Sequence, residues 1–200
     1  WVVLARYLFI TPDTSSSVEN RPGRPAGLGH LREVLNLPTT WRFALAKFLT
    51  DPVWWFYLYW TPKYLGNSFG LKLSGLGLPL VIIYLAADVG SIGGGWCSSF
   101  LGRRGFSEAR ARTSVMLVCA ALPLSVILLA TTSDLFWAVA ILSVATAAHQ
   151  GWSANLFATA SALVAKEQVA SVIGVGGMAG ALGGIILAEV AGHVLEYTGS

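Results

Sequence analysis

The chain has 200 residues, of which 54% are hydrophobic and only 12% are charged. Soluble globular domains carry about 25% charged residues, because their outer faces meet water. The composition therefore excludes a soluble helical bundle and predicts an integral membrane protein. The 22 glycines and 8 tryptophans agree with this prediction, since glycine permits close packing of membrane helices and tryptophan prefers the membrane interface.

Motifs for catalysis and metal binding are absent from the sequence. The patterns H-E-x-x-H and G-x-S-x-G do not occur, and Cys97 and Cys119 both lie in apolar segments, so neither a metal site nor a disulfide framework is indicated. We therefore predict no catalytic residue, no metal, no cofactor and no nucleic-acid partner. A membrane-embedded hydrolase or transferase that uses His149 with an acid is the alternative from the class of enzymes.

Residues 1–43 precede the first complete apolar span. Residues 1–10 (WVVLARYLFI) are interpreted as the end of a transmembrane helix, and because no start methionine or signal peptide is present, this beginning indicates a fragment. Residues 11–43 are polar, rich in Pro, Gly and Ser, and predicted to be a central loop. Its last part, LREVLNLPTTWRF, is expected to form a short surface helix that ends before Pro38.

Residues 44–200 are predicted to form a transmembrane bundle. Five apolar stretches are long enough to cross a bilayer, which takes about 20 residues in a helix. They cover residues 44–65, 76–101, 114–132, 135–161 and 169–195.

Lysine and arginine are distributed unevenly between the two sides of this bundle. If the spans alternate, one side receives ten of them: Arg21, Arg24, Arg32, Arg42, Lys47, Arg103, Arg104, Arg110, Arg112 and Lys166. The other side receives Lys63 and Lys72. Cytoplasmic loops are enriched in Lys and Arg, so the long connector and the Arg-rich loop are predicted to be cytoplasmic.

The second span ends in GWCSSFLGRRGFSEARART. Major facilitator transporters carry the pattern G-x-x-x-D-[RK]-x-G-R-[RK] between the second and third helices of each half, and this stretch resembles it. The matching residues are Gly95, Gly102, Arg103 and Arg104. Ser99 stands in place of the aspartate and Phe100 in place of the first base, which weakens the gating pair. The resemblance implies that Arg103 and Arg104 take part in gating.

Four longer stretches carry a more specific resemblance: KFLTDPVWWFYLYWTPKYL, GLPLVIIYLAADVGSIGGGWCSSFL, AAHQGWSANLF and GVGGMAGALGG. They closely resemble bacterial hexuronate transporters, in the anion:cation symporter branch of the major facilitator superfamily. The resemblance runs from about Leu45 to the C-terminus. It implies an all-α membrane fold in which the five spans are helices 7 to 11 of twelve and residues 1–10 end helix 6. The first half and helix 12 would then be missing.

The resemblance also implies a function. It predicts a secondary active transporter for hexuronates (glucuronate or galacturonate) in the bacterial inner membrane, with proton symport and alternating access. The partners would be the organic anion, the proton, the lipid bilayer and the missing N-terminal half of the same transporter. Transport of another organic anion, such as an aldonate or related sugar acid, is one alternative. A non-transporting membrane sensor is the other.

Asp88 lies in the second span and is the one charged residue of YLAADVGSIGGGWCSSF (84–100). Helical spacing places it on one face with Tyr84, Ser91 and Gly95, while the opposite side holds Gly90 and Gly93, which suit close packing. A carboxylate in the membrane is costly unless it is paired or used. Asp88 either lines the substrate and proton path or pairs with a donor from a neighbouring helix. The negative charge of the substrate favours the second, structural or gating, interpretation.

The first span carries a dense row of aromatic residues. Helical spacing places Phe56, Tyr59, Trp60 and Lys63 on one face. Aromatic rings stack on sugar C–H faces, and Lys63 would meet the carboxylate of a uronate. We therefore predict that Tyr59, Trp60 and Lys63 bind substrate. The alternative is an aromatic belt with a lysine that reaches the outer interface.

The segment HQGWSANLF (149–157) places polar side chains at mid-membrane depth. At 100° per residue, His149, Trp152 and Asn155 span an arc of about 120°, and Gln150 falls outside it. Lipid does not tolerate such a set, so the arc is predicted to bind substrate through imidazole, indole and amide. A structural role for His149 is the alternative.

The fifth span is predicted to pack through small residues four apart. Two such seams are Gly176–Gly180–Gly184 and Gly177–Ala181. Near the outer end, Glu189 and His193 are expected to pair with each other. Glu189 is the second candidate proton-linked residue, beside Asp88.

Overall fold

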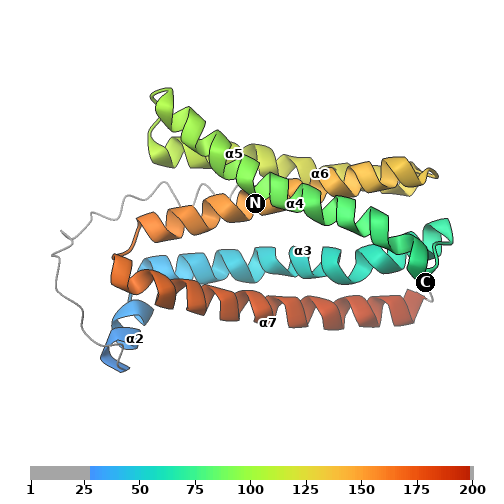
Figure 1. Cartoon of the computed structure of the whole chain (residues 1–200). Helices are drawn as coiled ribbons and strands as arrows, with labels where there is room; N and C mark the ends of the chain where they lie inside the picture. The colour runs from blue at the N-terminus through green and yellow to red at the C-terminus, as the bar shows by residue number, and fades with distance from the viewer. Residues whose placement is uncertain (1–27, 199–200) are drawn as a thin grey trace. The chain divides into compact units, whose positions relative to one another are not determined.

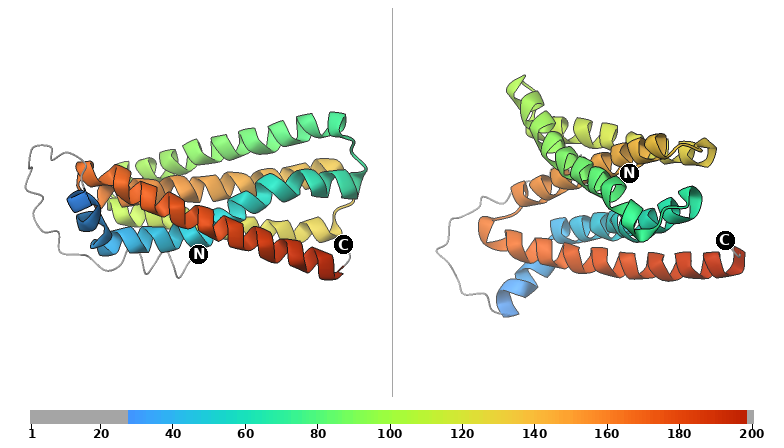
Figure 2. Two further views of the ribbon diagram at one scale, coloured as in Figure 1. Left: turned by 90° about the horizontal axis from the view of Figure 1, so that it is seen from below. Right: turned by 45° about the vertical axis from the view of Figure 1, so that its right-hand side comes forward.

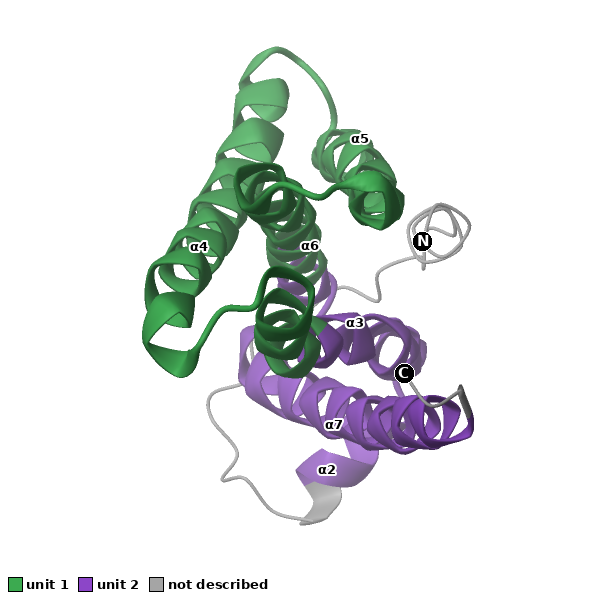
Figure 3. Ribbon diagram, turned by 90° about the vertical axis from the view of Figure 1, so that its right-hand side faces the viewer, with its two compact units in different colours: residues 1–6, 57–156 green, residues 7–56, 157–200 purple. Residues whose placement is uncertain are grey.

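The computed structural model describes residues 28–198 (Figure 1). The helix end predicted at residues 1–10 and residues 11–27 of the predicted loop lie outside this range. The described residues contain helices and no strand, which confirms the all-α prediction. They divide into two compact units, one made of residues 57–156 and the other of residues 28–56 and 157–198 (Figure 3).

The helices follow one another with short connections. They are α2 (Leu28–Leu35), α3 (Pro38–Phe69), α4 (Leu73–Arg103), α5 (Glu108–Ala121), the 3-10 helix η1 (Leu122–Thr131), α6 (Leu135–Ala162) and α7 (Lys166–Thr198). The long helices α4 and α7 run without interruption (Figure 2). α2 ends before Pro38, as predicted, and α3 begins at Pro38, ahead of the predicted span 44–65.

Four stretches are long and apolar enough to cross a membrane. They are Leu73–Arg103, Glu108–Thr131, Leu135–Ala162 and Lys166–Tyr197. Each of them contains most of one predicted span. The remaining predicted span lies in α3, which is long enough but not apolar enough to join the four. Its low hydropathy comes from Lys47, Asp51 and Lys63 together with a row of Trp and Tyr residues.

In the unit of residues 57–156, α4 packs closely against α6. A methyl group on Gly90 would overlap the backbone of Ala147, and one on Gly94 would lie 2.6 Å from the Cα of Gly151. Gly151 also lies beside Cys119 of α5, so α6 runs between α4 and α5 (Figure 3). Small residues thus let the helix backbones approach, as is typical of membrane helices. The prediction of Gly90 as a packing residue is confirmed, whereas Gly93 faces open space.

In the unit of residues 28–56 and 157–198, α7 packs along the first part of α3 through glycines (Figure 1). Gly176 lies against Phe43, Gly180 against Asp51, and Gly184 against Trp55. The two helices therefore run parallel. The predicted seam Gly176–Gly180–Gly184 is confirmed. The second predicted seam is wrong, because Gly177 has nothing within 4 Å and Ala181 is exposed.

The corner between α2 and α3 is closed by two side chains of α3. The hydroxyl of Thr40 donates to the carbonyl of Val34 at 2.6 Å, and the indole of Trp41 donates to Leu35 at 2.8 Å. They satisfy carbonyls at the end of α2, where no helical partner is available. Pro38 fits the first turn of α3 because its missing N–H has no helical acceptor there.

The contact between α4 and α6 predicts a difference between two neighbouring glycines. Gly94→Ala should destabilise the detergent-solubilised protein by about 1–3 kcal/mol, because the backbones of α4 and α6 must move apart to admit a methyl group. Gly93→Ala is the matched control and should be neutral or slightly stabilising, since its site is open and alanine favours helix. Thermal unfolding measures both. Equal melting temperatures for the two variants would contradict the packing described here.

Candidate functional site

The arc predicted on α6 is buried in the structure. The exposed fractions of its three side chains are 4% for His149 and 1% each for Trp152 and Asn155. The amide nitrogen of Asn155 donates to the carbonyl of Gly151 at 2.9 Å, which orients the side chain along its own helix. Gln150, predicted to lie outside the arc, is half-buried. The three side chains thus form a polar and aromatic row inside the protein.

The helix that carries this row is well defined at its start. Asp134 precedes α6, and its carboxylate accepts from the backbone N–H of Phe136 at 2.7 Å and of Trp137 at 3.4 Å. A carboxylate in this position satisfies free N–H groups and complements the helix dipole. In the middle of α6, the hydroxyl of Thr146 donates to the backbone carbonyl of Leu142, one turn earlier in the same helix, at 2.9 Å.

Tyr57 of α3 contacts this row. Its ring lies edge-on to the imidazole of His149, with 6.4 Å between the ring centroids, and Tyr57 is itself buried. The face predicted from Phe56, Tyr59, Trp60 and Lys63 left Tyr57 out. Sequence reasoning therefore missed it, although its position, one residue after Phe56 in the aromatic row, was the available signal.

The predicted residues of α3 lie on a more open face than Tyr57. Tyr59 is 66% exposed, Lys63 is exposed, and Trp60 is half-buried. The ammonium of Lys63 lies 4.7 Å from the centre of the Trp60 ring, a cation–π contact. The structure therefore brings Trp60 and Lys63 together, in an arrangement that suits both a substrate carboxylate and an interfacial lysine.

Asp88 lies on the exposed side of α4, away from the glycines that contact α6. Within residues 28–198 its carboxylate makes no hydrogen bond or ion pair. One turn earlier, the hydroxyl of Tyr84 points to the carbonyl of Leu58 in α3 at 3.5 Å. A neighbouring donor for Asp88, as the structural interpretation requires, would have to come from outside the described residues.

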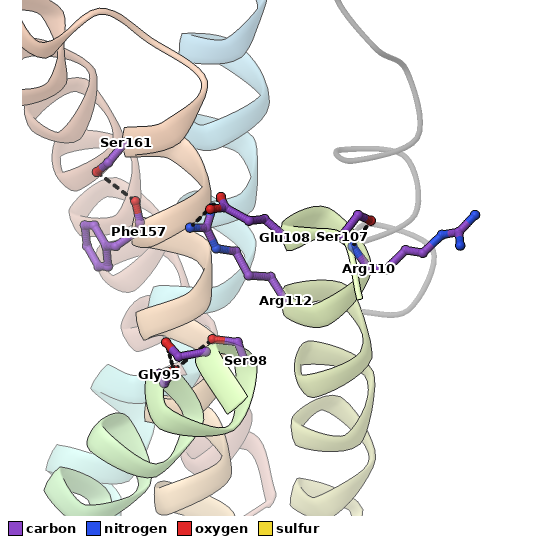
Figure 4. A network of polar contacts seen from close by, with 9 residues as sticks. Gly95, Ser98, Ser107, Glu108, Arg110, Arg112, Phe157 and Ser161 are labelled. Atoms are coloured by element: carbon purple, nitrogen blue, oxygen red, sulfur yellow. Dashed lines mark hydrogen bonds and ion pairs between the residues drawn. The ribbon is translucent and has the colours of Figure 1, made fainter. Parts of the chain in front are cut away.

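The Arg-rich turn between α4 and α5 is held by backbone hydrogen bonds. Gly105 (φ +93°) donates to Gly102 at 3.0 Å and Phe106 donates to Leu101 at 3.2 Å, the Schellman arrangement that ends many helices. Ser107 then begins α5 by accepting from the N–H of Arg110 at 3.4 Å (Figure 4).

Arg103 and Arg104, the candidate gating residues, are both exposed at this turn. Arg104 lies 4.6 Å from the ring of Phe100, and Ser99 donates to the carbonyl of Gly95 at 3.0 Å in its own helix. The two departures from the family pattern thus have local uses. The face of the Phe100 ring contacts Arg104, and the hydroxyl of Ser99 forms a hydrogen bond with the backbone of its own helix, where the family's aspartate would pair with a basic residue.

Glu189 is exposed on α7. The expected pairing with His193 is wrong, because the imidazole of His193 lies 3.9 Å from the carboxylate of Glu196 instead. Residues three and four apart are both neighbours on a helix, so spacing alone does not choose between these two acids.

The chemistry that these groups offer is binding without covalent reaction. Imidazole, amide and indole groups donate or accept hydrogen bonds, and the rings offer flat apolar faces. Among the described residues, no three His, Cys, Asp or Glu side chains gather closely enough for a metal ion. Long apolar helices that bury such a row define a multi-span membrane protein.

The sequence profile of the Major Facilitator Superfamily matches residues 1–188 of the chain. The chain belongs to this superfamily, and the resemblance found in its sequence is confirmed. The chain is 30% identical over 156 residues to a D-galactonate transporter of Escherichia coli O6:H1. It is 26% identical over 168 residues to hexuronate transporters of Escherichia coli K12 and O157:H7. These relatives are transporters and not enzymes.

The matched regions cover most of this chain but little of each relative. They cover 78% of the chain and 36% of the D-galactonate transporter. For the hexuronate transporters the shares are 84% of the chain and 39% of the relative. The chain thus spans less than half the length of the relatives that it matches.

Proposed function

We propose that the chain is the second half of a secondary active transporter for sugar acids. The observation that supports it most is the buried row of His149, Trp152 and Asn155 with Tyr57 at its edge. Apolar helices seldom bury polar side chains on one face unless these meet polar partners, and such groups inside membranes mark substrate paths. The hydroxyl groups of a sugar acid can exchange hydrogen bonds with imidazole, indole and amide groups of this kind.

In this proposal the neutral row binds the sugar and a cation binds its carboxylate. The amide and imidazole groups pair with hydroxyls, and the rings of Trp152 and Tyr57 pack on the C–H face. Lys63 is the candidate cation, with Tyr59 and Trp60 beside it on the same helix. A substrate carboxylate would draw the ammonium of Lys63 away from the Trp60 ring.

Transport is proposed to follow alternating access, with substrate held between two halves of a complete transporter near mid-membrane. Proton symport supplies the driving force. Asp88 and Glu189 are the candidate proton-linked groups in this chain, and Arg103 and Arg104 are the candidate gating residues. The proposed location is the bacterial inner membrane, where the first half of the transporter completes the path.

Hexuronates are the first proposed substrates and aldonates such as D-galactonate the second. Both are monoanionic sugar acids, which fits one cation beside a set of neutral donors. A hexuronate closes into a pyranose ring with a flat C–H face for stacking, whereas an aldonate is an open chain. The aromatic residues around His149 therefore favour glucuronate and galacturonate.

Counterflow in proteoliposomes tests this function. The complete transporter should exchange labelled glucuronate with internal glucuronate or galacturonate, more weakly with galactonate, and not with neutral glucose. A pH gradient should drive accumulation of glucuronate. Exchange of galactonate alone would place the chain with the aldonate transporters. Substrate binding without any counterflow would contradict transport and favour a sensor.

The proposed orientation predicts which turns are reached from outside the cell. In a variant without Cys97 and Cys119, single cysteines at Asn67 and Ser133 should react with a membrane-impermeant maleimide in intact cells. A cysteine at Ser107 should react only after the membrane is opened. All three positions are exposed in the structure, so burial does not limit their reaction. Labelling of position 107 in intact cells would reverse the orientation.

A further inference from the structure

Helix α3 carries three charged residues inside the stretch 44–65 that is proposed to cross the membrane, and two of them, Lys47 and Asp51, form a pair. The ammonium of Lys47 and the carboxylate of Asp51 lie one helical turn apart and 2.6 Å from each other. Their side chains are 8% and 18% exposed. At a rise of 1.5 Å per residue, Asp51 lies about 10 Å along the helix from residue 44. The pair is therefore neither in a loop nor on the surface.

Lys47 is enclosed by aromatic rings and a glycine. Its ammonium lies 4.4 Å from the centre of the Phe157 ring, and Phe157 packs edge-on against Phe43 with 5.5 Å between centroids. A methyl group on Gly176 of α7 would lie 3.3 Å from Cγ of Lys47. The aliphatic stem thus packs on glycine while the charge meets a ring face. From the sequence, Lys47 counts only among the basic residues of the cytoplasmic side, and the structure adds that its side chain is buried within α3.

Asp51 of α3 packs against a second glycine of α7, Gly180. A methyl group on Gly180 would overlap Oδ2 of Asp51 and lie 2.8 Å from its Cγ. The facing stretch of α7, residues 174–184, contains no charged residue. Among the described residues Lys47 is thus the one cation paired with Asp51. The glycine leaves room for the carboxylate, and the lysine cancels its charge.

We propose that Lys47 and Asp51 act as one neutral group that lets α3 cross the bilayer and seats it on the glycines of α7. In this way α3 crosses the bilayer although its hydropathy is below that of the other spans, because two of its charged residues do not face lipid as separate ions. Removing one partner of a buried pair leaves an uncompensated charge, whereas replacing both partners by neutral groups is often tolerated. The proposal does not depend on which substrate is carried.

A set of single and double substitutions tests the pair in the complete transporter. The background lacks Cys97 and Cys119 and carries a cysteine at Asn67, just beyond the span. Two quantities are measured, the amount of monodisperse protein after gel filtration and the labelling of position 67 by an impermeant maleimide. Labelling of the unsubstituted background sets the reference. Neither measurement uses a substrate, so a wrong assignment of the sugar acid leaves the result unaffected.

Lys47→Met should lower the labelled, monodisperse protein roughly tenfold, because Asp51 is left deep in the span without its cation. Asp51→Asn should cost less, since a lone lysine near the helix start extends toward the interface. The double variant Lys47→Met/Asp51→Asn should recover to within about twofold of the reference. A double variant that is worse than Lys47→Met would overturn the proposal, because the two residues would then act independently.

The glycine seat has its own matched control, which stays informative if the charge variants fail to fold. Gly180→Ala should lower the amount of labelled, monodisperse protein, because the added methyl group displaces the carboxylate of Asp51. Gly177→Ala, on the same helix but facing open space, should leave it unchanged. If both variants equal the reference, Asp51 is not seated on Gly180 and the proposal is wrong.

Discussion

Replacing Trp152 or Asn155 by alanine in the complete transporter should weaken sugar-acid binding by about tenfold to a hundredfold. The loss of one buried hydrogen bond or stacking contact costs about 1–3 kcal/mol, which corresponds to that range. Both residues belong to the buried row on α6. Gln150→Ala should have a smaller effect, because Gln150 is half-buried and falls outside the arc by helical spacing. The half-saturation concentration in counterflow measures each change.

A control must separate binding from packing, because Trp152→Ala also leaves a large cavity. Leu156 is 2% exposed and lies on the same helix, so Leu156→Ala removes buried volume without removing a polar contact. We expect Leu156→Ala to reduce the amount of folded protein while the half-saturation concentration per folded molecule stays unchanged. An equal increase in that concentration for Leu156→Ala would show that the row is structural. A severe effect of Gln150→Ala would place the substrate on the other side of α6.

The helix packing shows how far residue spacing predicts contacts. The seam Gly176–Gly180–Gly184 is predictable, since small residues four apart form one stripe and membrane helices associate through such stripes. The stripe Gly177–Ala181, turned by only one residue, is also made of small residues, yet Gly177 faces open space and Ala181 is exposed. Likewise Gly94, not Gly93, contacts α6. Spacing predicts that a small-residue face exists, but the partner helix decides which of two adjacent faces is used.

The candidate site shows a similar limit. The arc of α6 is predictable because polar residues at three-residue intervals are conspicuous in an apolar helix. Tyr57 is not, because in a row where nearly every residue is aromatic any face looks equally suitable. Asp51 was missed although the signal was present, a lysine one turn before an acid inside an apolar stretch. Such a pair is neutral as a unit, but an inspection of one residue at a time counts two separate charges and misses that they cancel.

Asp88→Asn should lower both concentrative uptake and substrate exchange, partially and together. Asp88 is exposed on α4, and within residues 28–198 nothing pairs with it. A carboxylate left in lipid is costly, so we expect a donor from another part of the transporter to meet it. An amide keeps the size of the carboxylate and one acceptor oxygen. It therefore retains some of these hydrogen bonds but neither ionises nor carries a proton.

Two further measurements distinguish a structural or gating acid from a proton carrier. Asp88→Ala should be more harmful than Asp88→Asn, because a buried donor on the partner is then left without an acceptor. Ser91→Ala, half-buried on the same face of α4, is a mild control. If Asp88 carries the proton, Asp88→Asn should instead abolish pH-driven accumulation and leave downhill exchange intact. We expect the joint, partial loss, because an ionised carboxylate beside the substrate path would repel the anion that the transporter binds. Accumulation lost with exchange preserved would make Asp88 the coupling group.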